Sequence, residues 1–321
     1  MSKVLDHIYQ VIGNTPMVRL NKIAEHHGVE GEILAKLEYL SPGFSKKDRP
    51  ALQIIKEAEA SGQLKPGQTV VELTSGNMGT GLSIVCSGRG YPFVACMSEG
   101  NSPERARMMR ALGAEVVLVK QVNGKPGMVT GEDLAQVELV TQKITEERGA
   151  FRADQFTLPG SYNGHRLHTA REIWEQSNGA IEAFADFAGS GGTFVGCAQG
   201  LKAYNPMIRC YLVEPETGAR YAKLPIRNNG QHQIQGGGYN MALPILDSQD
   251  EKLIDGFIQI SDEEAVAAAR DLARLEGIFA GFSSGANVMA AIKLLRGKEK
   301  GKAIAILLPD SGLKYLSTNL Y

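Results

Sequence analysis

Short apolar runs alternate with stretches of helical periodicity along most of the chain, and this alternation restricts the possible folds more than any other feature. Strands that alternate with helices pair in parallel, because each helix returns the chain across the sheet. We therefore predict an α/β protein with mainly parallel sheets. The expected strands are Ile33–Lys36, Thr69–Glu72, Phe93–Cys96, Ala114–Val119, Ala183–Phe187, Ile208–Val213 and Ala303–Leu308. The expected helices are one from Pro50 onward, Pro103–Leu112, Leu134–Arg148, Gly196–Tyr204, Asp262–Gly277 and Gly285–Leu295.

Charge and composition narrow the class of partner. The 34 basic residues nearly cancel the 35 acidic ones, and no block of like charge dominates, so neither a nucleic acid nor an anionic membrane is indicated. The terminus Met1–His7 lacks the apolar core of a signal peptide, and no apolar run approaches a membrane span, which predicts a cytoplasmic protein. With 321 residues, we expect two domains and a small-molecule ligand.

The cysteines and histidines give no support for a metal site. The cysteines form no CxxC pair, so we expect buried thiols in a reducing compartment. His165 and His168 could share a helix face, but no third ligand is near them in sequence. The cysteines are Cys86, Cys96, Cys197 and Cys210.

Two glycine-rich turns between an expected strand and an expected helix indicate anion binding. Thr74–Gly79 combines hydroxyl and amide side chains with glycines, and backbone N–H groups at such a helix start suit a carboxylate. Gly189–Thr193 is a cup of glycine, serine and threonine that suits a phosphate. Phe194 stands where a dinucleotide fingerprint requires glycine. A third turn, Ala280–Gly285, also opens a helix, and all three turns could line one edge of a parallel sheet.

Lys46 and Lys47 lie between the turn dipeptide Pro42–Gly43 and a helical segment. Taken alone, such a pair is more typical of solvated surface charges. Beside a phosphate cup and a carboxylate cradle, a lysine at this junction predicts a phosphorylated aldehyde cofactor acting on an amino acid, which is pyridoxal phosphate.

Motifs spread over nearly the whole chain resemble one known family, the fold-type II pyridoxal-phosphate enzymes, and within it the cysteine synthase and cystathionine β-synthase group. Each motif alone is weak, but their shared order along the chain is specific. They are Ile12–Pro16, Pro42–Arg49, Thr74–Gly79, Gly189–Thr193, Ser283–Gly285, Leu308–Gly312 and Tyr315–Thr318.

The resemblance implies a fold and a set of site residues. The fold is two three-layer α/β domains similar to the tryptophan synthase β-chain, with the cofactor between them. Residues 46–152 would form the smaller substrate-binding domain, and 1–45 with 153–321 the larger cofactor-binding domain. Lys47 would carry the cofactor, with Lys46 at a variable position. The other implied cofactor contacts are Asn77 at the ring hydroxyl, Gly189, Ser190, Gly191, Gly192 and Thr193 at the phosphate, and Ser283 at the ring nitrogen. The implied substrate contacts are Thr74, Ser75 and Gln155 at the α-carboxylate, with Met78, Gly237 and Tyr239 nearby.

The activity implied by the resemblance is β-replacement on serine or an O-activated serine, with cysteine synthesis from O-acetylserine and sulfide as the leading version. Cystathionine β-synthase-like condensation of serine with a thiol, and β-elimination from cysteine, are alternatives. A catalytically idle regulatory homologue is an alternative of another class. The resemblance also implies a homodimer, and it leaves open the binding of a serine acetyltransferase.

Departures from the family pattern concern the substrate. Ser41 and Phe44 stand in a motif that usually reads Asn-Pro-Gly-Gly-Ser, and Met78 replaces a usual threonine, which removes one hydroxyl near the carboxylate. The Gly238–Tyr239 step looks more like cystathionine β-synthase. The loop 121–131 is expected to be exposed and to act as a lid.

Overall fold

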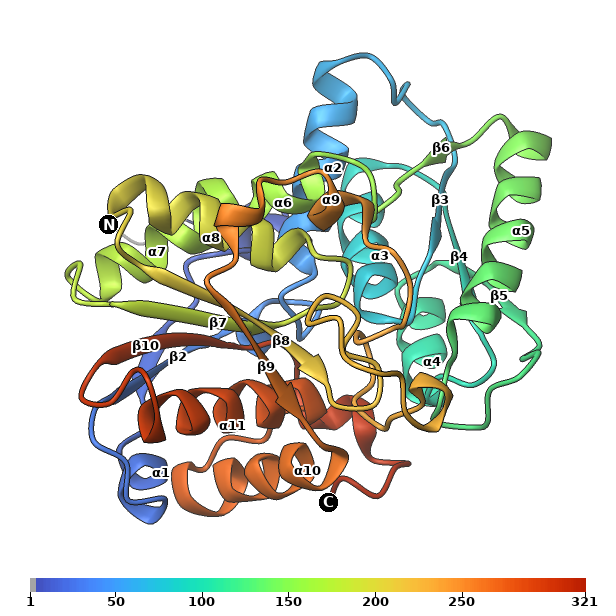
Figure 1. Ribbon diagram of the computed structural model, residues 1–321. Coiled ribbons are helices and arrows are strands. Elements are labelled where there is room, and N and C mark those ends of the chain that lie inside the picture. The colour runs from blue at the N-terminus through green and yellow to red at the C-terminus, as the bar shows by residue number, and fades with distance from the viewer. Residues whose placement is uncertain (1–3) are drawn as a thin grey trace.

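A computed structural model describes residues 4–321 and contains two β-sheets (Figure 1). The large sheet has six strands in the order β1-β2-β10-β7-β8-β9, and the small sheet has four in the order β5-β4-β3-β6. Neighbouring strands pair in parallel except β1, which runs antiparallel to β2. The strands are β1 (Met17–Arg19), β2 (Glu32–Leu37), β3 (Val70–Leu73), β4 (Phe93–Ser98), β5 (Glu115–Val119), β6 (Phe151–Arg152), β7 (Ala183–Phe187), β8 (Arg209–Pro215), β9 (Gly256–Ile260) and β10 (Ala303–Leu308).

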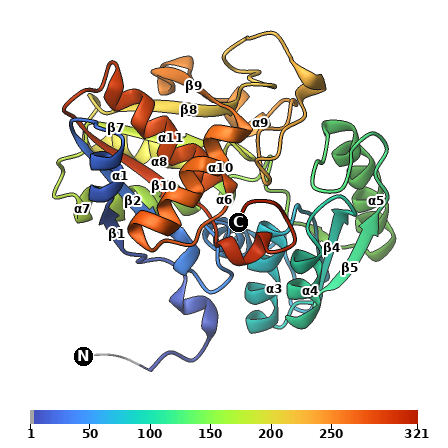
Figure 2. The same ribbon diagram turned by 90° about the horizontal axis from the view of Figure 1, so that it is seen from below.

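Helices connect most of the strands and cover both sheets. Figure 2 shows the small sheet with α3, α4 and α5 to one side of the large sheet. The α-helices are α1 (Asn21–His26), α2 (Asp48–Ala60), α3 (Asn77–Arg89), α4 (Pro103–Ala111), α5 (Gly131–Arg148), α6 (Gly160–Gly164), α7 (Ala170–Gln176), α8 (Gly192–Tyr204), α9 (Pro244–Asp247), α10 (Asp262–Asp271) and α11 (Phe282–Arg296). Shorter helical segments are η1 (Ile8–Val11), η2 (Glu38–Leu40), η3 (His165–Thr169), η4 (Asn228–Gly230), η5 (Glu251–Leu253), η6 (Leu272–Glu276) and η7 (Gly312–Tyr315).

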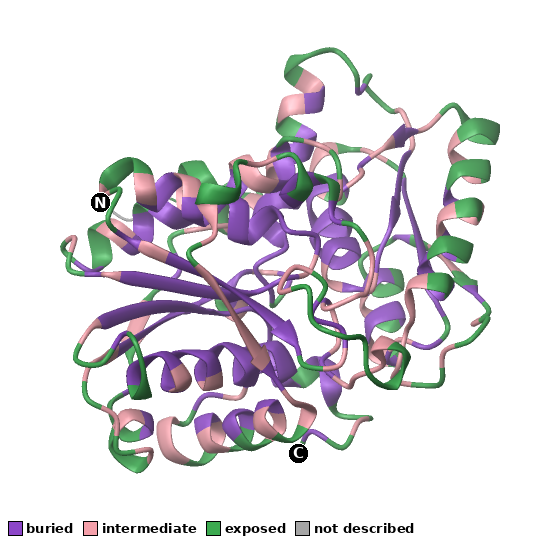
Figure 3. Ribbon diagram, viewed as in Figure 1, coloured by how far each residue is buried: buried purple, intermediate pink, exposed green. Residues whose placement is uncertain are grey.

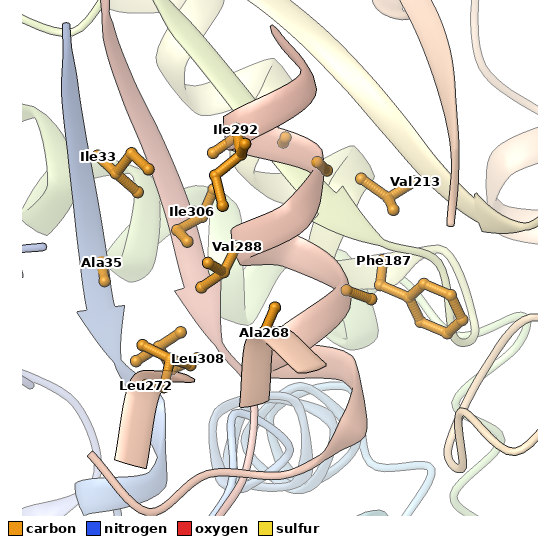
Figure 4. Close-up of a cluster of buried hydrophobic side chains, with 14 of the residues drawn as sticks. Ile33, Ala35, Phe187, Val213, Ala268, Leu272, Val288, Ile292, Ile306 and Leu308 are labelled. Carbon is orange, nitrogen blue, oxygen red and sulfur yellow. The ribbon is translucent and has the colours of Figure 1, made fainter. Parts of the chain in front are cut away.

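The inner strands β7 and β10 of the large sheet are buried on both faces, which explains why they are nearly continuous apolar runs. Side chains alternate along a strand, so Ile304 and Ile306 of β10 enter one core and Ala305 and Leu307 enter the other. The first core includes residues of α10 and α11 and is drawn in Figure 4. The second core includes residues of α7 and α8. Figure 3 shows most strands buried between helices whose outer faces are exposed.

The small sheet repeats this three-layer arrangement. Val70 of β3 packs in a core with residues of α2, α3 and α4, and its neighbour Val71 packs on the opposite face with Leu134 and Val137 of α5. Each sheet therefore has its own pair of cores. The small sheet lies within residues 70–152, inside the predicted range 46–152, although the exact domain boundary stays a prediction.

Most expected strands and helices are present, with a few differences at their ends. Ala183–Phe187 and Ala303–Leu308 form strands with the expected bounds. Three strands were not predicted, and all three lie at the edges of the two sheets: β1, β6 and β9. All four cysteines are buried and free, as expected. Within residues 4–321, none of the helices has the length and apolar character needed to cross a membrane.

Arg49, in the first turn of α2, ties this helix to η2, which follows β2, and to α7. Its buried guanidinium donates to both carboxylate oxygens of Glu38 and to both of Glu172, over 2.7–2.8 Å. It also donates to the hydroxyl of Thr15 at 3.1 Å. Lys47 is the N-cap of α2, so this network fixes the backbone position of Lys47.

Candidate active site

Lys47 lies between the carboxyl ends of the two sheets, where α/β proteins bind ligands, in a cavity made of two adjoining hollows that share Lys47, Asn77, Gly189, Ser190 and Gly236. We call it the Lys47 cavity. It is lined by Lys46, Lys47, Leu73, Ser75, Asn77, Met78, Leu134, Gln155, Phe156, Asp186–Gly191, Thr193, Phe194, Gln235, Gly236, Tyr239, Ser283 and Pro309. All the predicted site residues therefore line it except Thr74, Gly192 and Gly237.

The amine of Lys47 has only neutral hydrogen-bond partners. Its Nζ donates to Oε1 of Gln155 at 2.9 Å and to Oγ of Ser190 at 3.0 Å. Burial, with a further contribution from the charge of Lys46, lowers the pKa of Lys47 to about 7, although Glu72 and Asp186 act in the opposite direction. A substantial fraction of Lys47 is therefore the unprotonated, nucleophilic amine near neutral pH.

Lys46, the neighbouring lysine, is not the surface charge that the isolated motif suggests. It is only 7% exposed, and its Nζ donates to both carboxylate oxygens of Asp186, at 2.9 and 2.7 Å. Asp186 lies near the carboxyl end of β7 and is 1% exposed. The two adjacent lysines thus share one cavity but have different partners.

The predicted phosphate cup is the N-terminus of α8. Gly191 is its N-cap, has φ 87°, and leaves the first turn of the helix without a side-chain cap. The helix begins at Gly192, earlier than expected, so Thr193 belongs to its first turn. Free N–H groups at the positive end of a helix form an anion site. His165 supports this turn, because its Nε2 lies 3.2 Å from Oγ1 of Thr193, and burial keeps the pKa of His165 well below its usual value.

The predicted carboxylate cradle is the N-terminus of α3. Oγ1 of Thr74 accepts hydrogen bonds from the N–H groups of Gly76 and Gly79, both at 2.9 Å. Thr74 is buried and shapes the turn from behind, whereas Ser75, Asn77 and Met78 face the cavity. The N-cap, Gly76, has no side chain, and the hydroxyl of Thr74 bonds the first turn of α3 in its place. Direct contact of Thr74 with a substrate stays a prediction.

Gln155 is locked in place by Glu72 of β3. Nε2 of Gln155 donates to Oε1 of Glu72 at 3.1 Å and to the carbonyl oxygen of Leu73 at 3.2 Å, which directs Oε1 toward Lys47. Burial raises the pKa of Glu72 to about 8, against the opposing charge of Arg152. Because both amide N–H groups are engaged, the predicted contact of Gln155 with a carboxylate would require an exchange of partners.

Asn77 is held by two residues of the Leu308–Gly312 region and the segment after it. Its Nδ2 donates to Oδ2 of Asp310 at 2.7 Å, and its Oδ1 accepts from Nζ of Lys314 at 2.7 Å. One N–H of Asn77 is left for a ligand. Ser283 lines the same cavity and lies in the first turn of α11, not in a turn before the helix as expected.

The loop 236–239 closes one side of the cavity. Gly238 donates its N–H to the carbonyl oxygen of Ala188 at 2.8 Å, and a Cβ on Gly237 would lie 2.4 Å from that oxygen. Gly237 thus allows the loop to approach the end of β7 and does not itself line the Lys47 cavity. Tyr239 does line it, beside Ser75 and Met78.

The other departures from the family pattern lie outside the cavity or at its edge. Phe44 has φ 58°, is 43% exposed and lies outside the residues that line the Lys47 cavity. Ser41 is buried.

The loop 121–131 is held by Asp133 of α5, whose carboxylate accepts hydrogen bonds from the N–H groups of residues 122–124 and of Thr130. Its residues 126–128 line a wider cavity that shares Gln235 with the Lys47 cavity, and the lid role stays a prediction.

Sequence reasoning missed four residues that organise this site. Lys46, Glu72, Asp186 and Lys314 are buried charges whose partners lie far away in sequence. A charged residue inside an apolar strand, such as Asp186 in Ala183–Phe187, is the one signal that could have drawn attention to them.

The described geometry agrees with what comparisons with known proteins show. A family model described as "Pyridoxal-phosphate dependent enzyme" matches residues 8–310. A cysteine synthase of Staphylococcus aureus is 37% identical over 99% of this chain and 98% of its own length. The crystal structure of an O-ureido-L-serine synthase is similar with a TM-score of 0.88 and 37% identity, over 99% of this chain and 95% of that one. The O-acetylserine dependent cystathionine β-synthase of Helicobacter pylori matches with a TM-score of 0.89 and 31% identity over 100% of both chains.

The chain therefore belongs to the pyridoxal-phosphate dependent enzyme family, with the fold of its fold-type II members. It is a pyridoxal-phosphate enzyme of the β-replacement group, as the sequence resemblance implied.

The cavity fits this cofactor on its own chemistry. A Cβ on Gly192 would lie 2.5 Å from Oγ of Ser161 and 2.8 Å from its carbonyl oxygen, so the start of α8 requires glycine at this position. The uncapped start of α8 suits a phosphate, and the amine of Lys47 suits an aldehyde.

Proposed function

We propose that Lys47 binds the aldehyde of pyridoxal phosphate covalently, that the start of α8 binds its phosphate, and that Asn77 and Ser283 contact its ring. The start of α3, through Ser75, Asn77 and Met78, would bind the α-carboxylate of an amino-acid substrate. When bound, the cofactor supplies an electron sink for a carbanion at the substrate Cα.

One observation carries this proposal. The amine of Lys47, whose pKa is lowered to about 7, lies in the same cavity as the start of α8, which has no side-chain cap, and the start of α3, where Ser75, Asn77 and Met78 line the wall. Two anion sites with an unprotonated amine match a ligand pair that carries one phosphate, one carboxylate and one aldehyde.

Lys47 would also perform the proton transfers. Its amine, when free, would remove the proton from Cα of the substrate, and the substituent would then leave Cβ with its bonding electron pair. Sulfide or another thiol adds to Cβ, and Lys47 returns a proton to Cα. Gln155 and Ser190 accept hydrogen bonds from Nζ in the described structure and are suited to orient it between these steps.

We propose O-acetylserine and sulfide as the substrates, so that the products are cysteine and acetate. The cysteine synthase of S. aureus supports this choice by its identity over the full chain. Condensation of an activated serine with a larger thiol is the second candidate, favoured by Tyr239 in the cavity wall and by the similarity to the H. pylori enzyme. β-Elimination from cysteine and a catalytically idle regulatory role remain as further outcomes of the test below.

We further propose that the protein is a cytoplasmic homodimer. Several large apolar side chains near the N-terminus and in and after η7 are exposed in the single chain, which supports a partner surface there. They are Val4, Ile8, Val11, Leu313 and Leu316. Sedimentation of the purified protein would show twice the chain mass, and a stable monomer would contradict this assignment.

The leaving group can be identified directly. The cofactor-loaded protein is mixed with O-acetylserine, O-phosphoserine, serine or cysteine, with and without sulfide, and the released group and the amino-acid product are quantified. We expect acetate and cysteine to form in equal amounts from O-acetylserine and sulfide. Turnover with only another member of the set would replace the proposed substrate, and turnover with none of the four would favour the regulatory role.

A further inference from the structure

Lys46 and Lys47 present two primary amines to one cavity, and either could in principle react with an aldehyde there. The bonds around the two amines distinguish them. Nζ of Lys46 makes a two-pronged ion pair with Asp186, whereas within residues 4–321 Nζ of Lys47 donates hydrogen bonds only to the amide oxygen of Gln155 and the hydroxyl of Ser190.

This difference matters because only an unprotonated amine attacks an aldehyde. The nitrogen lone pair forms a bond to the aldehyde carbon, and a carbon–nitrogen double bond results as one water leaves, carrying the aldehyde oxygen and the two amine hydrogens. An ammonium ion has no lone pair for this step. A carboxylate within hydrogen-bond distance stabilises the ammonium form, while neutral oxygen partners in a buried site do not stabilise it comparably.

We propose that Asp186 is a positioning residue that selects Lys47 as the cofactor lysine, because it holds Lys46 as an ion-paired ammonium in the wall of the cavity. This inference rests on the proposed role of Lys47. The inference also explains why a second lysine stands beside Lys47, because the positive charge of Lys46 favours the unprotonated amine of Lys47.

The surroundings of Asp186 show that its carboxylate is held in one orientation. Oδ1 accepts a second hydrogen bond from Nδ2 of Asn287 at 3.0 Å. Asn287 is fully buried on α11 and also bonds the N–H of Phe187 and the carbonyl oxygen of Leu307. The backbone N–H of Lys46 donates to the carbonyl oxygen of Pro309 at 2.8 Å, which fixes the other side of the pair.

Other charges near Lys47 do not replace this arrangement. Glu72 of β3 is, with Asp186, one of two acidic side chains that raise the pKa of Lys47. It bonds Gln155 and Arg152 and not Lys46. Burial lowers the pKa of His165, and the charges of Arg49, Lys46 and Lys47 lower it further. Asp186 is thus the carboxylate that separates the two lysines.

The test uses the full chain and maps the site of attachment. Wild type, K47A, D186N and K47A/D186N are incubated with pyridoxal phosphate at pH 7, reduced with borohydride, digested, and analysed by peptide mass spectrometry. K47A/E72Q is the matched control, because it replaces an equally buried acidic side chain that bonds Gln155 and Arg152 and not Lys46. Cooperative thermal unfolding confirms that each variant is folded.

We expect label on Lys47 in the wild type and almost none on Lys46 in K47A or K47A/E72Q. In K47A/D186N, label on Lys46 should rise about tenfold or more above K47A, because the two-pronged ion pair that occupies its amine is lost. D186N, which keeps Lys47, should divide the label between both lysines, and it serves if the double variant does not fold.

The outcomes separate this inference from the proposed function. Absence of label from both lysines in the wild type would refute the role of Lys47. Label on Lys47 in the wild type, with Lys46 still unlabelled in folded D186N and K47A/D186N, would overturn the role of Asp186 alone. Label on Lys46 in K47A with Asp186 intact would also overturn it.

Discussion

Arg49 offers a sharp test of how the fold positions the site. The substitution R49M keeps much of the side-chain volume and removes the charge that joins Glu38 and Glu172. Glu38 is fully buried, and without Arg49 it would keep only the hydrogen bond from Thr15. Glu172 would keep its 2.7 Å ion pair with Lys36. Removing one partner of a buried charge network typically costs about 3–5 kcal/mol.

The control for R49M is R148M. Arg148 makes an equally short two-pronged pair with Glu115, but both side chains are about half exposed. An exposed pair contributes about 0–1 kcal/mol, so R148M should change the free energy of unfolding by no more than that. Urea unfolding followed by fluorescence of Trp174, the single tryptophan, reports on α7, which also carries Glu172.

The effect of R49M should also depend on pH. Burial raises the pKa of Glu172, but the bonds and charges of Arg49 and Lys36 outweigh this and lower it from 4.5 to about 2. The stabilisation from ionised Glu172 is therefore complete above pH 4.5 and is lost as the pH falls toward 2. The difference between R49M and wild type should narrow over this window. A loss below about 1 kcal/mol at pH 7, equal to that of R148M, would refute the role given to Arg49.

Three further predictions concern the cavity and the loop beside it. The rate at which the apoprotein captures pyridoxal phosphate, followed by stopped-flow absorbance, should rise with pH up to about 7 and then level off, because burial lowers the pKa of Lys47 to about 7. A rate that climbs steadily to pH 10 would contradict this. G192A should weaken cofactor binding by about 1–3 kcal/mol in a fluorescence titration, because the new Cβ meets Ser161; unchanged affinity would show that α8 can move. D133A should speed amide hydrogen exchange at residues 122–124, whose N–H groups bond the carboxylate of Asp133. In the wild type, the protection of these amides should fade as the pH falls toward 2, since backbone N–H groups hold the pKa of Asp133 near 2. Equal exchange rates in both proteins would count against this role of Asp133.

The sequence predicts elements best where local pattern and burial coincide. Ala183–Phe187 and Ala303–Leu308 are apolar on both faces because both faces are covered, and their ends were predicted to the residue. The edge strand β9 was missed, since its residues are only partly buried and carry no continuous apolar run. The helix starts at Gly192 and Phe282 were predicted late, because glycine and serine in a first turn look like loop residues.

For the site, the sequence motifs predicted the ligand-binding groups but not the side chains that orient them. Motifs at strand ends indicated two anion sites and a lysine, and the structure brings all three to one cavity. The partner of Lys46 could not be predicted, since Asp186 lies 140 residues away and ion pairing follows from tertiary structure. The same limit applies to Gln155, whose orientation depends on Glu72 on another strand.

The central claim is that Lys47 performs β-replacement in this cavity. The most direct measurement is the rate of cysteine formation from O-acetylserine and sulfide by wild type, K47M and K65M, with Lys65 as an exposed lysine outside the cavity. We expect wild type and K65M to form cysteine at equal rates, and the rate of K47M to be lower by at least about 100-fold, the usual contribution of a positioned acid–base group. Cysteine formation by K47M at the wild-type rate would contradict the account.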